Sequence, residues 1–393
     1  MMINQLRREF QEIYFNNIST TKGLEELAKN IGISKNSLRR FLQKIKDDTT
    51  LRVSTLTLIA QQLGYKDYAD FCDSIGRQKY SLDFELLDIY YGIVKGQGTT
   101  LNETRFQKAN YYFAQKIISD PLNLKEFVKR FADNYEALEY VLAWHPSYEN
   151  IANSNYQAAL LQLARSSPKA HIKVFAYSFV VFGKFMSEKL AVSEAKELIA
   201  KIEKYVYKMR EEEGEFHAFP EARYVIAKTI YAYLTGTDAK SRRPDAALQR
   251  LIGLQHISAS PIDKIIFGTY VTNILNILHD YENADLCLGE LLSEKTLLKI
   301  KEENPHLSTH IFLYKLNWVI TQFHLGRKDE ALLVFETLPS DLIKVHTSSF
   351  DSKIYFELKY LYFARSLYPK RQDIKRRFDF LVEKTQFTFL HKA

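Results

Sequence analysis

Glycine, proline and cysteine are scarce in this chain of 393 residues, which has 14 Gly, 9 Pro and 2 Cys. So few turn-forming residues argue against collagen-like repeats and against turn-rich all-β folds. The hydrophobic fraction of 46%, with 26 Phe and 25 Tyr, argues against disorder, because such a chain can bury enough apolar surface to offset its conformational entropy. We therefore expect an all-α protein of two or three domains.

The two cysteines, Cys72 and Cys287, are too few and too far apart for a disulfide framework or a zinc knuckle. No apolar stretch follows the charged residues at the start of the chain, as a secretory signal would require. The longest apolar run, residues 174–182, is far shorter than the roughly 18 residues of a membrane span. The sequence thus predicts a cytoplasmic protein without a membrane segment.

Residues 23–71 carry the most informative pattern. A first apolar stripe at helical spacing ends at Gly32, which can take the left-handed conformation that closes a helix. Ser34 is a good N-cap for a second short helix, whose apolar positions are Leu38, Phe41 and Leu42. Two short helices joined by a three- to four-residue turn that contains glycine are typical of a helix-turn-helix.

The second of these helices has a polar arc opposite its apolar one. That arc holds Lys35, Asn36, Arg39, Arg40 and Gln43, and residues 34–46 include five cations but no acid. Lys and Arg displace counterions from phosphates, while Arg, Asn and Gln can make paired hydrogen bonds to base edges. The arc is therefore either a DNA-binding face or an ordinary solvated face that happens to be basic.

The segments on either side complete a domain. A helix over residues 3–13 precedes the pair, another capped by Ser54 ends at Gly64, and Asp67 starts a fifth. In Leu27-Ala28, Gly32-Ile33-Ser34, Leu38 and residues 56–64, the sequence resembles the phage-repressor (Cro and lambda-repressor) type of helix-turn-helix domain. Residues 1–80 also hold 13 basic and 9 acidic side chains, hence +4 of the chain's net +7.

This resemblance implies a five-helix domain over residues 1–76, whose third helix enters the major groove, usually as a homodimer on a two-fold site. Carried onto this chain, it places Lys35, Asn36 and Arg39 near base edges, with Gln43 on the same face. The resemblance places four further cations nearer the phosphates of double-stranded DNA: Arg40, Lys44, Lys22 and Arg52.

Residues 77–393 form the second predicted domain, an almost unbroken series of helices. Residues 316–339, with Gly326 at a hairpin turn followed by Ala331 and Phe335, resemble the tetratricopeptide repeat, and residues 278–288 form a second copy with His279 in place of the glycine. The resemblance implies an α-solenoid of helical hairpins with a concave surface suited to a peptide or protein partner. Asn273 and Asn276 would face inward there and pair with a peptide backbone, unless they are solvated or cap a neighbouring helix.

Other candidate sites are weaker. His306 and His310 share a helical face but lack a third ligand nearby, so we expect no metal. The basic segment 365–384, with a net charge of +4, is either a contact for DNA or an acidic partner, or an amphipathic capping helix with an exposed basic side. No nucleophile elbow, phosphate loop or acid pair is evident, so we expect no cofactor and no enzyme.

These observations favour a DNA-binding transcriptional regulator. Its helix-turn-helix would read an operator, and its helical-repeat body would dimerise, sense a peptide or protein, or do both. The combination resembles the peptide-sensing regulators of bacteria. The alternative is a non-enzymatic interaction scaffold, in which the helix-turn-helix serves as a protein-binding module.

Overall fold

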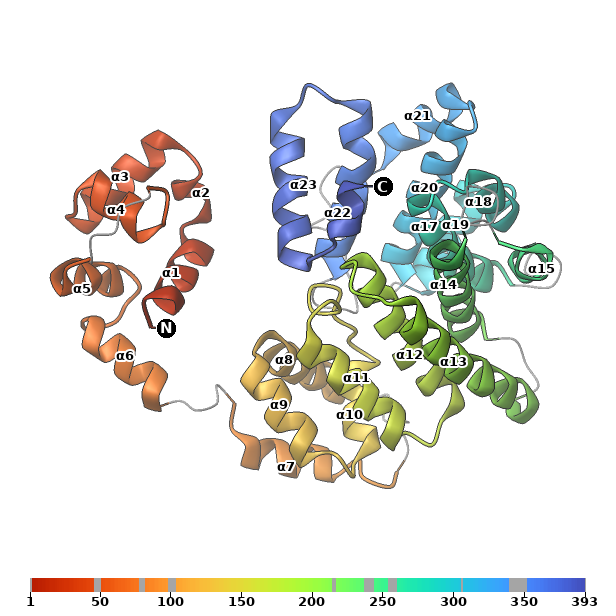
Figure 1. Cartoon of the computed structure of the whole chain (residues 1–393), viewed down its shortest axis with the longest axis horizontal. Helices are drawn as coiled ribbons and strands as arrows, with labels where there is room; N and C mark the ends of the chain where they lie inside the picture. Colours follow the sequence, from red (N-terminus) through yellow and green to blue (C-terminus); the bar gives the residue numbers. More distant parts are fainter. Residues whose placement is uncertain are drawn as a thin grey trace. The chain divides into compact units, whose positions relative to one another are not determined.

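The computed structural model describes residues 2–45, 51–77, 82–97, 104–213, 217–236, 244–253, 260–304, 307–338 and 352–392. Every regular element in these ranges is a helix, and none of them is a strand, so the predicted all-α class is confirmed (Figure 1). In the same ranges, no helix is both long and apolar enough to span a membrane. The chain divides into two compact units, Met1–Ser81 and Leu82–Ala393.

The first unit contains the helices α1 (Met2–Ile13), α2 (Phe15–Ile18), α3 (Thr21–Ile31), α4 (Lys35–Phe41), α5 (Val53–Gln62) and α6 (Tyr68–Arg77). The second unit begins with α7 (Phe84–Gly92), α8 (Thr104–Ser119), α9 (Pro121–Arg130), α10 (Tyr135–Leu142), α11 (Ser154–Ser166), α12 (Ala170–Met186), α13 (Val192–Glu213) and α14 (Ala218–Thr235). It continues with α15 (Ala246–Gly253), α17 (Pro261–Ile277), α18 (Tyr281–Leu288), α19 (Glu294–Glu303), α20 (Ser308–His324), α21 (Lys328–Thr337), α22 (Ser352–Leu367), α23 (Gln372–Thr385) and the 3₁₀ helix η3 (Thr388–His391).

The described part of the first unit has one helix more than the five predicted from the sequence. The extra one is α2, a single turn that Tyr14 separates from α1. The Tyr14 hydroxyl donates to the carbonyl of Gln62 at 3.0 Å and thereby joins this corner to the end of α5. The predicted cap at Ser54 is also wrong, because the N-cap of α5 is Arg52, two residues earlier, and the helix begins at Val53.

The segment that joins α3 to α4 agrees closely with the local sequence signals. Gly32 has a φ of 80°, in the left-handed region, and closes α3. The Ser34 side chain then accepts a hydrogen bond from the Ser37 amide at 3.0 Å, which confirms the predicted N-cap of α4. The direction of the chain therefore changes within three residues.

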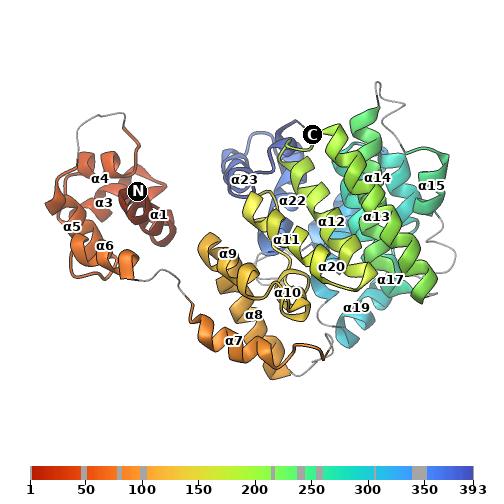
Figure 2. The ribbon, with the colours of Figure 1, turned by 60° about the horizontal axis from the view of Figure 1, so that its bottom comes forward.

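The second unit is built from neighbouring helix pairs. Contacting pairs along the chain are α12 with α13, α14 with α15, α17 with α18, α20 with α21, and α22 with α23. The first helix of each pair also contacts the first helix of the next pair, in the order α12, α14, α17, α20 and α22 (Figure 2). One buried cluster joins two successive pairs, α14 with α15 and α17 with α18, through residues that include Val225, Leu248, Leu275 and Ala284.

Two of the helix pairs turn in the same way, as their similar sequences suggest. Gly326, between α20 and α21, has a φ of 92°, and His279, between α17 and α18, has a φ of 59°. Ala331 and Ala284, the small residues after these turns, are both fully buried. His279 thus adopts the left-handed conformation that Gly326 adopts at lower conformational cost.

The C-terminal helices return to an early part of the second unit. The ring centroids of Phe389 in η3 and Phe185 in α12 are 4.5 Å apart. Of the basic side chains in 365–384, Arg377 binds Glu357 through two hydrogen bonds of 2.6 and 2.8 Å, and Lys384 pairs with Glu149 at 3.2 Å. Two cations of the segment 365–384 therefore hold α23 to the rest of the unit.

Candidate functional site

Helix α4 is fixed to the core of the first unit by its apolar side. Leu38 and Phe41 are fully buried, and the Phe41 ring meets Phe10 of α1 edge to face at 5.5 Å. The Arg7 guanidinium donates to the carbonyl of Phe41 and lies 5.7 Å from the centroid of its ring. This packing determines which side of α4 faces solvent.

The opposite side of α4 presents four of the predicted DNA-binding residues. Asn36, Arg39 and Arg40 are exposed and have the i, i+3, i+4 spacing of one helical face, and Gln43, which follows α4, is exposed as well. Gln43 lies just beyond the helix, with a φ of 55°, where the Lys44 amide donates to the Arg39 carbonyl at 2.8 Å. The exposed side chains on α4 and just after it thus carry an amide, two guanidinium groups and a second amide.

Two of the predicted cations are engaged within the unit. Lys35 is half-buried and pairs with Glu25 of α3 at 3.0 Å. The Lys44 ammonium donates to the carbonyl of Ile18, and burial, together with the nearby charge of Arg39, lowers the pKa of Lys44. Lys35 thus joins α4 to α3, and Lys44, which is itself exposed, joins the segment after α4 to the end of α2.

The remaining predicted cations lie outside α4. Lys22, in the first turn of α3, is exposed and pairs with Glu26 at 4.0 Å, which is a weak interaction at such exposure. Arg52 is exposed at the N-cap of α5. Lys46, counted above among the five cations of this region, lies outside the described residues.

Asn273 and Asn276 of the second unit lie between helices. Asn276 is fully buried. Its amide nitrogen donates to the Asn317 carbonyl of α20 at 3.0 Å, and its oxygen accepts from the Thr321 hydroxyl at 2.9 Å. Asn273 is 6% exposed and donates to the Tyr355 hydroxyl of α22. Both side chains hold helices together here, and their role in ligand binding stays a prediction.

A buried cationic cluster near Asn273 is missed by the sequence reasoning. Arg223 of α14 is 2% exposed; it donates to the Tyr148 hydroxyl at 3.1 Å and lies 4.4 Å from the centroid of the Tyr270 ring. Tyr148 in turn stacks on Tyr355 with a centroid distance of 4.4 Å. An arginine within the mostly apolar run of α14 was the one available signal, because a charge on a buried helical face requires partners.

Lys359 of α22 is a second buried cation that no local pattern indicates. It is fully buried, and among the described residues its ammonium has no hydrogen-bond partner. Burial lowers the pKa of Lys359 from 10.5 to about 7, since a low-dielectric interior disfavours the charged form.

Metal-ligating groups do not gather in the described part of the chain, where no cluster of three His, Cys, Asp or Glu side chains could hold an ion. The ring of His310 makes a 2.9 Å hydrogen bond between Nε2 and the Tyr270 hydroxyl, and His306 lies outside the described residues.

A cavity of about 380 Å³ lies among residues of α22, α23 and η3, and its lining includes Arg365, Arg371, Lys375 and His391. Arg371 is bound to Asp373 by two hydrogen bonds, of 2.8 and 2.5 Å. The cavity and the exposed face of α4 are thus both basic, but they belong to different units.

Comparison with known proteins gives no match to a protein-family model, to a curated protein or to a solved structure. The function must therefore be argued from the residues of this chain alone.

Proposed function

We propose that the chain is a DNA-binding transcriptional regulator of the cytoplasm. Its first unit would act as a helix-turn-helix domain of the phage-repressor type, with α4 as the recognition helix. Its second unit would act as a tetratricopeptide-like solenoid that dimerises, senses a peptide or protein partner, or does both. The proposal rests mainly on one observation, the exposed face of Asn36, Arg39, Arg40 and Gln43.

The chemistry of this face supports DNA as the partner. Residues 34–45 contain no acidic side chain, so phosphates could approach the face without repulsion from α4 itself. Arg39 can make paired hydrogen bonds to guanine, Arg40 can bind a phosphate, and Asn36 and Gln43 can make paired hydrogen bonds to adenine. A helix whose inner side is locked by Leu38 and Phe41 holds these groups in a fixed arrangement, which limits the entropy lost on binding.

The test is to select bound fragments of the source genome with the purified chain and then to compare variants on the fragments found. Arg39→Ala/Arg40→Ala should weaken binding by about 10- to 1000-fold and reduce the salt dependence by about two counterions. The matched control is Arg8→Ala/Lys66→Ala, which removes the same charge from two exposed positions outside α4.

Equal affinity of the wild-type chain and the Arg39→Ala/Arg40→Ala variant would refute the assignment of α4. Failure to retain any fragment at low salt would refute DNA binding altogether, and would favour the interaction scaffold.

A further inference from the structure

Cationic side chains line the cavity of about 380 Å³ that lies among α22, α23 and η3. The three elements pack together, since α23 contacts both α22 and η3 (Figure 1). Arg365 belongs to α22, Arg371 is the N-cap of α23, Lys375 lies in α23 and His391 lies in η3. The volume is within the range of about 300–1,000 Å³ that is usual for sites of small molecules. The cavity therefore has the size of a small-molecule site and walls from three packed elements.

Arg365 is held in one position at the wall of this cavity. Its guanidinium carbon lies 4.3 Å from the ring centroid of Phe378 and 5.0 Å from that of Tyr362. The guanidinium also donates to the Leu390 carbonyl at 3.1 Å. Burial lowers the pKa of Arg365, because partial removal from water disfavours the charged form. An anion in the cavity would offset this cost, and the planar guanidinium would need little further ordering to bind it.

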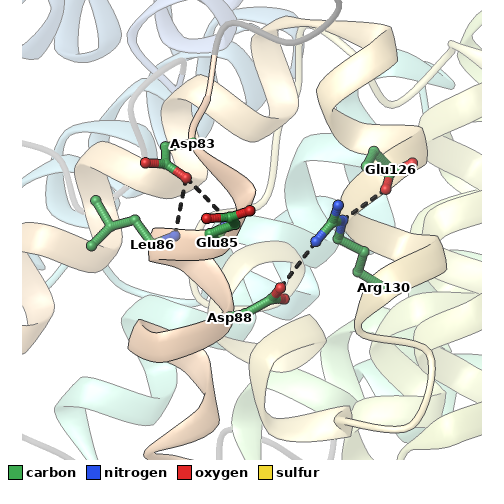
Figure 3. Close-up of polar contacts among 6 residues, drawn as sticks. All are labelled: Asp83, Glu85, Leu86, Asp88, Glu126 and Arg130. Carbon is green, nitrogen blue, oxygen red and sulfur yellow. Dashed lines mark hydrogen bonds and ion pairs between the residues drawn. The ribbon is translucent and has the colours of Figure 1, made fainter.

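Carboxylates offset other arginines of the second unit. Arg130 of α9 bridges Asp88 of α7 at 3.0 Å and Glu126 at 2.7 Å (Figure 3). Arg371, in the wall of the cavity, is bound to Asp373 by two hydrogen bonds, of 2.8 and 2.5 Å. Arg371 therefore adds little net charge to the cavity.

The other charged groups give the lining an excess of positive charge. Arg365 and Lys375 are two cations, and Asp379 is the acid that lines the cavity with them. A carboxylate oxygen of Asp379 lies 3.9 Å from Nδ1 of His391, so a proton on that ring would offset the acid. The cavity thus attracts anions.

The arrangement of donors fits a phosphate group better than a carboxylate. Arg365 and Lys375 approach the cavity from two different helices. A phosphate ester offers three terminal oxygens in a tetrahedral arrangement and carries nearly two negative charges at neutral pH, which two cations can share, whereas a carboxylate offers two oxygens in one plane. The rings of Phe378 and Tyr368 also line the cavity and provide apolar surface for the rest of such a molecule.

The position of Arg365 favours a small soluble molecule over the phosphates of DNA. Small molecules bind in concave sites, and Arg365 lies in one, half-buried against Phe378. Arg39 and Arg40 of α4, by contrast, are exposed, as a cation must be to meet the outer edge of a double helix.

We propose that the cavity among α22, α23 and η3 binds a small soluble phosphate ester, with Arg365 and Lys375 as the cations that hold the phosphate group. Phe378 and Tyr368 contact the apolar part of the ligand. The site goes beyond the proposed function and does not depend on it, because the cavity belongs to the second unit and α4 belongs to the first.

The first experiment titrates the full chain with phenyl phosphate, and separately with benzoate, in a buffer without other multivalent anions. Isothermal calorimetry measures binding. Phenyl phosphate should bind with a dissociation constant below about 1 mM and at least tenfold more tightly than benzoate, and inorganic phosphate should compete with it. The absence of any binding of phenyl phosphate up to about 10 mM, or equal affinity for phenyl phosphate and benzoate, overturns the proposal.

Charge variants test the site itself. Lys375→Gln should lower the affinity for phenyl phosphate about tenfold or more, and its exposed position makes a loss of folding unexpected. Arg365→Gln should lower it at least as much, with unchanged circular dichroism as the check on its fold. The matched control is Lys370→Gln, which removes the same charge from an exposed position outside the lining and should bind like the wild-type chain. Wild-type affinity in folded Lys375→Gln, or an equal loss in Lys370→Gln, overturns the assignment of the site.

DNA binding separates this proposal from the proposed function. Lys375→Gln should bind the selected genomic fragments as tightly as the wild-type chain does. If the chain binds phenyl phosphate through Lys375 but retains no DNA, the phosphate site stands and the regulator is refuted. If Lys375→Gln binds DNA more weakly while the wild-type chain does not bind phenyl phosphate, the cavity contacts the phosphates of DNA and the proposal is overturned.

Discussion

Replacing Lys359 with methionine should stabilise the second unit, and by more at low pH than at high pH. The ammonium of Lys359 is fully buried, and it has no hydrogen-bond partner among the described residues. Its pKa falls from 10.5 to about 7 on folding. At 1.36 kcal/mol for each pKa unit, the cost of keeping this side chain charged in the folded state is about 5 kcal/mol.

The direction of the pH dependence follows from proton binding. Between pH 7 and pH 10.5 the unfolded chain holds the Lys359 proton more tightly than the folded chain, so stability rises as pH increases through this window. The cost is about 5 kcal/mol at pH 6 and falls to about 2 kcal/mol at pH 9. Lys359→Met, which has similar volume and no charge, should therefore be more stable than the wild-type chain by amounts that shrink over this pH range.

Denaturant unfolding followed by tryptophan fluorescence measures the stability of the second unit, which contains Lys359. Both tryptophans of the chain, Trp144 and Trp318, belong to the second unit, so the signal excludes unfolding of the first. Lys375→Met, at an exposed position of α23, is the control and should show no such trend. An equal advantage of Lys359→Met at pH 6 and pH 9, or a loss of stability at pH 6, would show that the Tyr362 ring, whose centroid lies 5.0 Å from the ammonium, compensates for the buried charge.

Four further substitutions test packing and backbone conformation. Gly183→Ala should lower the free energy of unfolding of the second unit by about 1–3 kcal/mol or more, because its Cβ would lie 2.3 Å from the carbonyl oxygen of Ile151. Gly268→Ala, whose Cβ would meet its nearest neighbour at 3.5 Å, should raise it by up to about 1 kcal/mol. Equal midpoints of denaturant unfolding for these two variants, followed by tryptophan fluorescence, would contradict both expectations. Asn276→Ala should lower the free energy of unfolding of the second unit by about 1–2 kcal/mol, because it removes two buried hydrogen bonds between α17 and α20. An unchanged free energy of unfolding would mean that these bonds are not stabilising. Gln43→Gly should stabilise the first unit by about 0.5–1 kcal/mol, because Gln43 has a φ of 55°, a left-handed conformation that glycine adopts at lower cost. Amide hydrogen exchange measures the effect: exchange in α3 and α4 should become slower, and faster exchange would contradict the prediction.

Local signals were sufficient wherever a feature depended on residues close together in the chain. The end of α3 at Gly32 and the N-cap of α4 at Ser34 were predicted correctly, because one backbone angle and one hydrogen bond across three residues define each. The same reasoning failed at Ser54, where Arg52 is the N-cap of α5. It also missed α2, which is too short for hydrophobic periodicity to indicate.

Helical periodicity separated the sides of α4, but it did not establish the environment of each side chain. It placed Lys35 with Asn36 and Arg39, whereas the structure joins Lys35 to Glu25 of α3. Sequence spacing likewise left open whether Asn273 faces a ligand, is solvated or caps a neighbouring helix, and the structure shows that its side chain donates to Tyr355, which is 82 residues away in the chain. Such partners depend on how helices dock against one another, and this cannot be obtained from one helix at a time.

The sequence by itself determined the all-helical class, the α3–α4 turn and the concentration of basic side chains near α4, because composition, periodicity and capping act within a few residues. Only the tertiary structure decided which polar groups are buried and which apolar groups stay exposed. Lys359 and Arg223 are enclosed, while Leu86 and Ile89 remain in solvent, although their local sequences do not indicate it. The physical reason is that burial is a property of the neighbours that a side chain meets after the helices pack, and those neighbours come from distant parts of the chain.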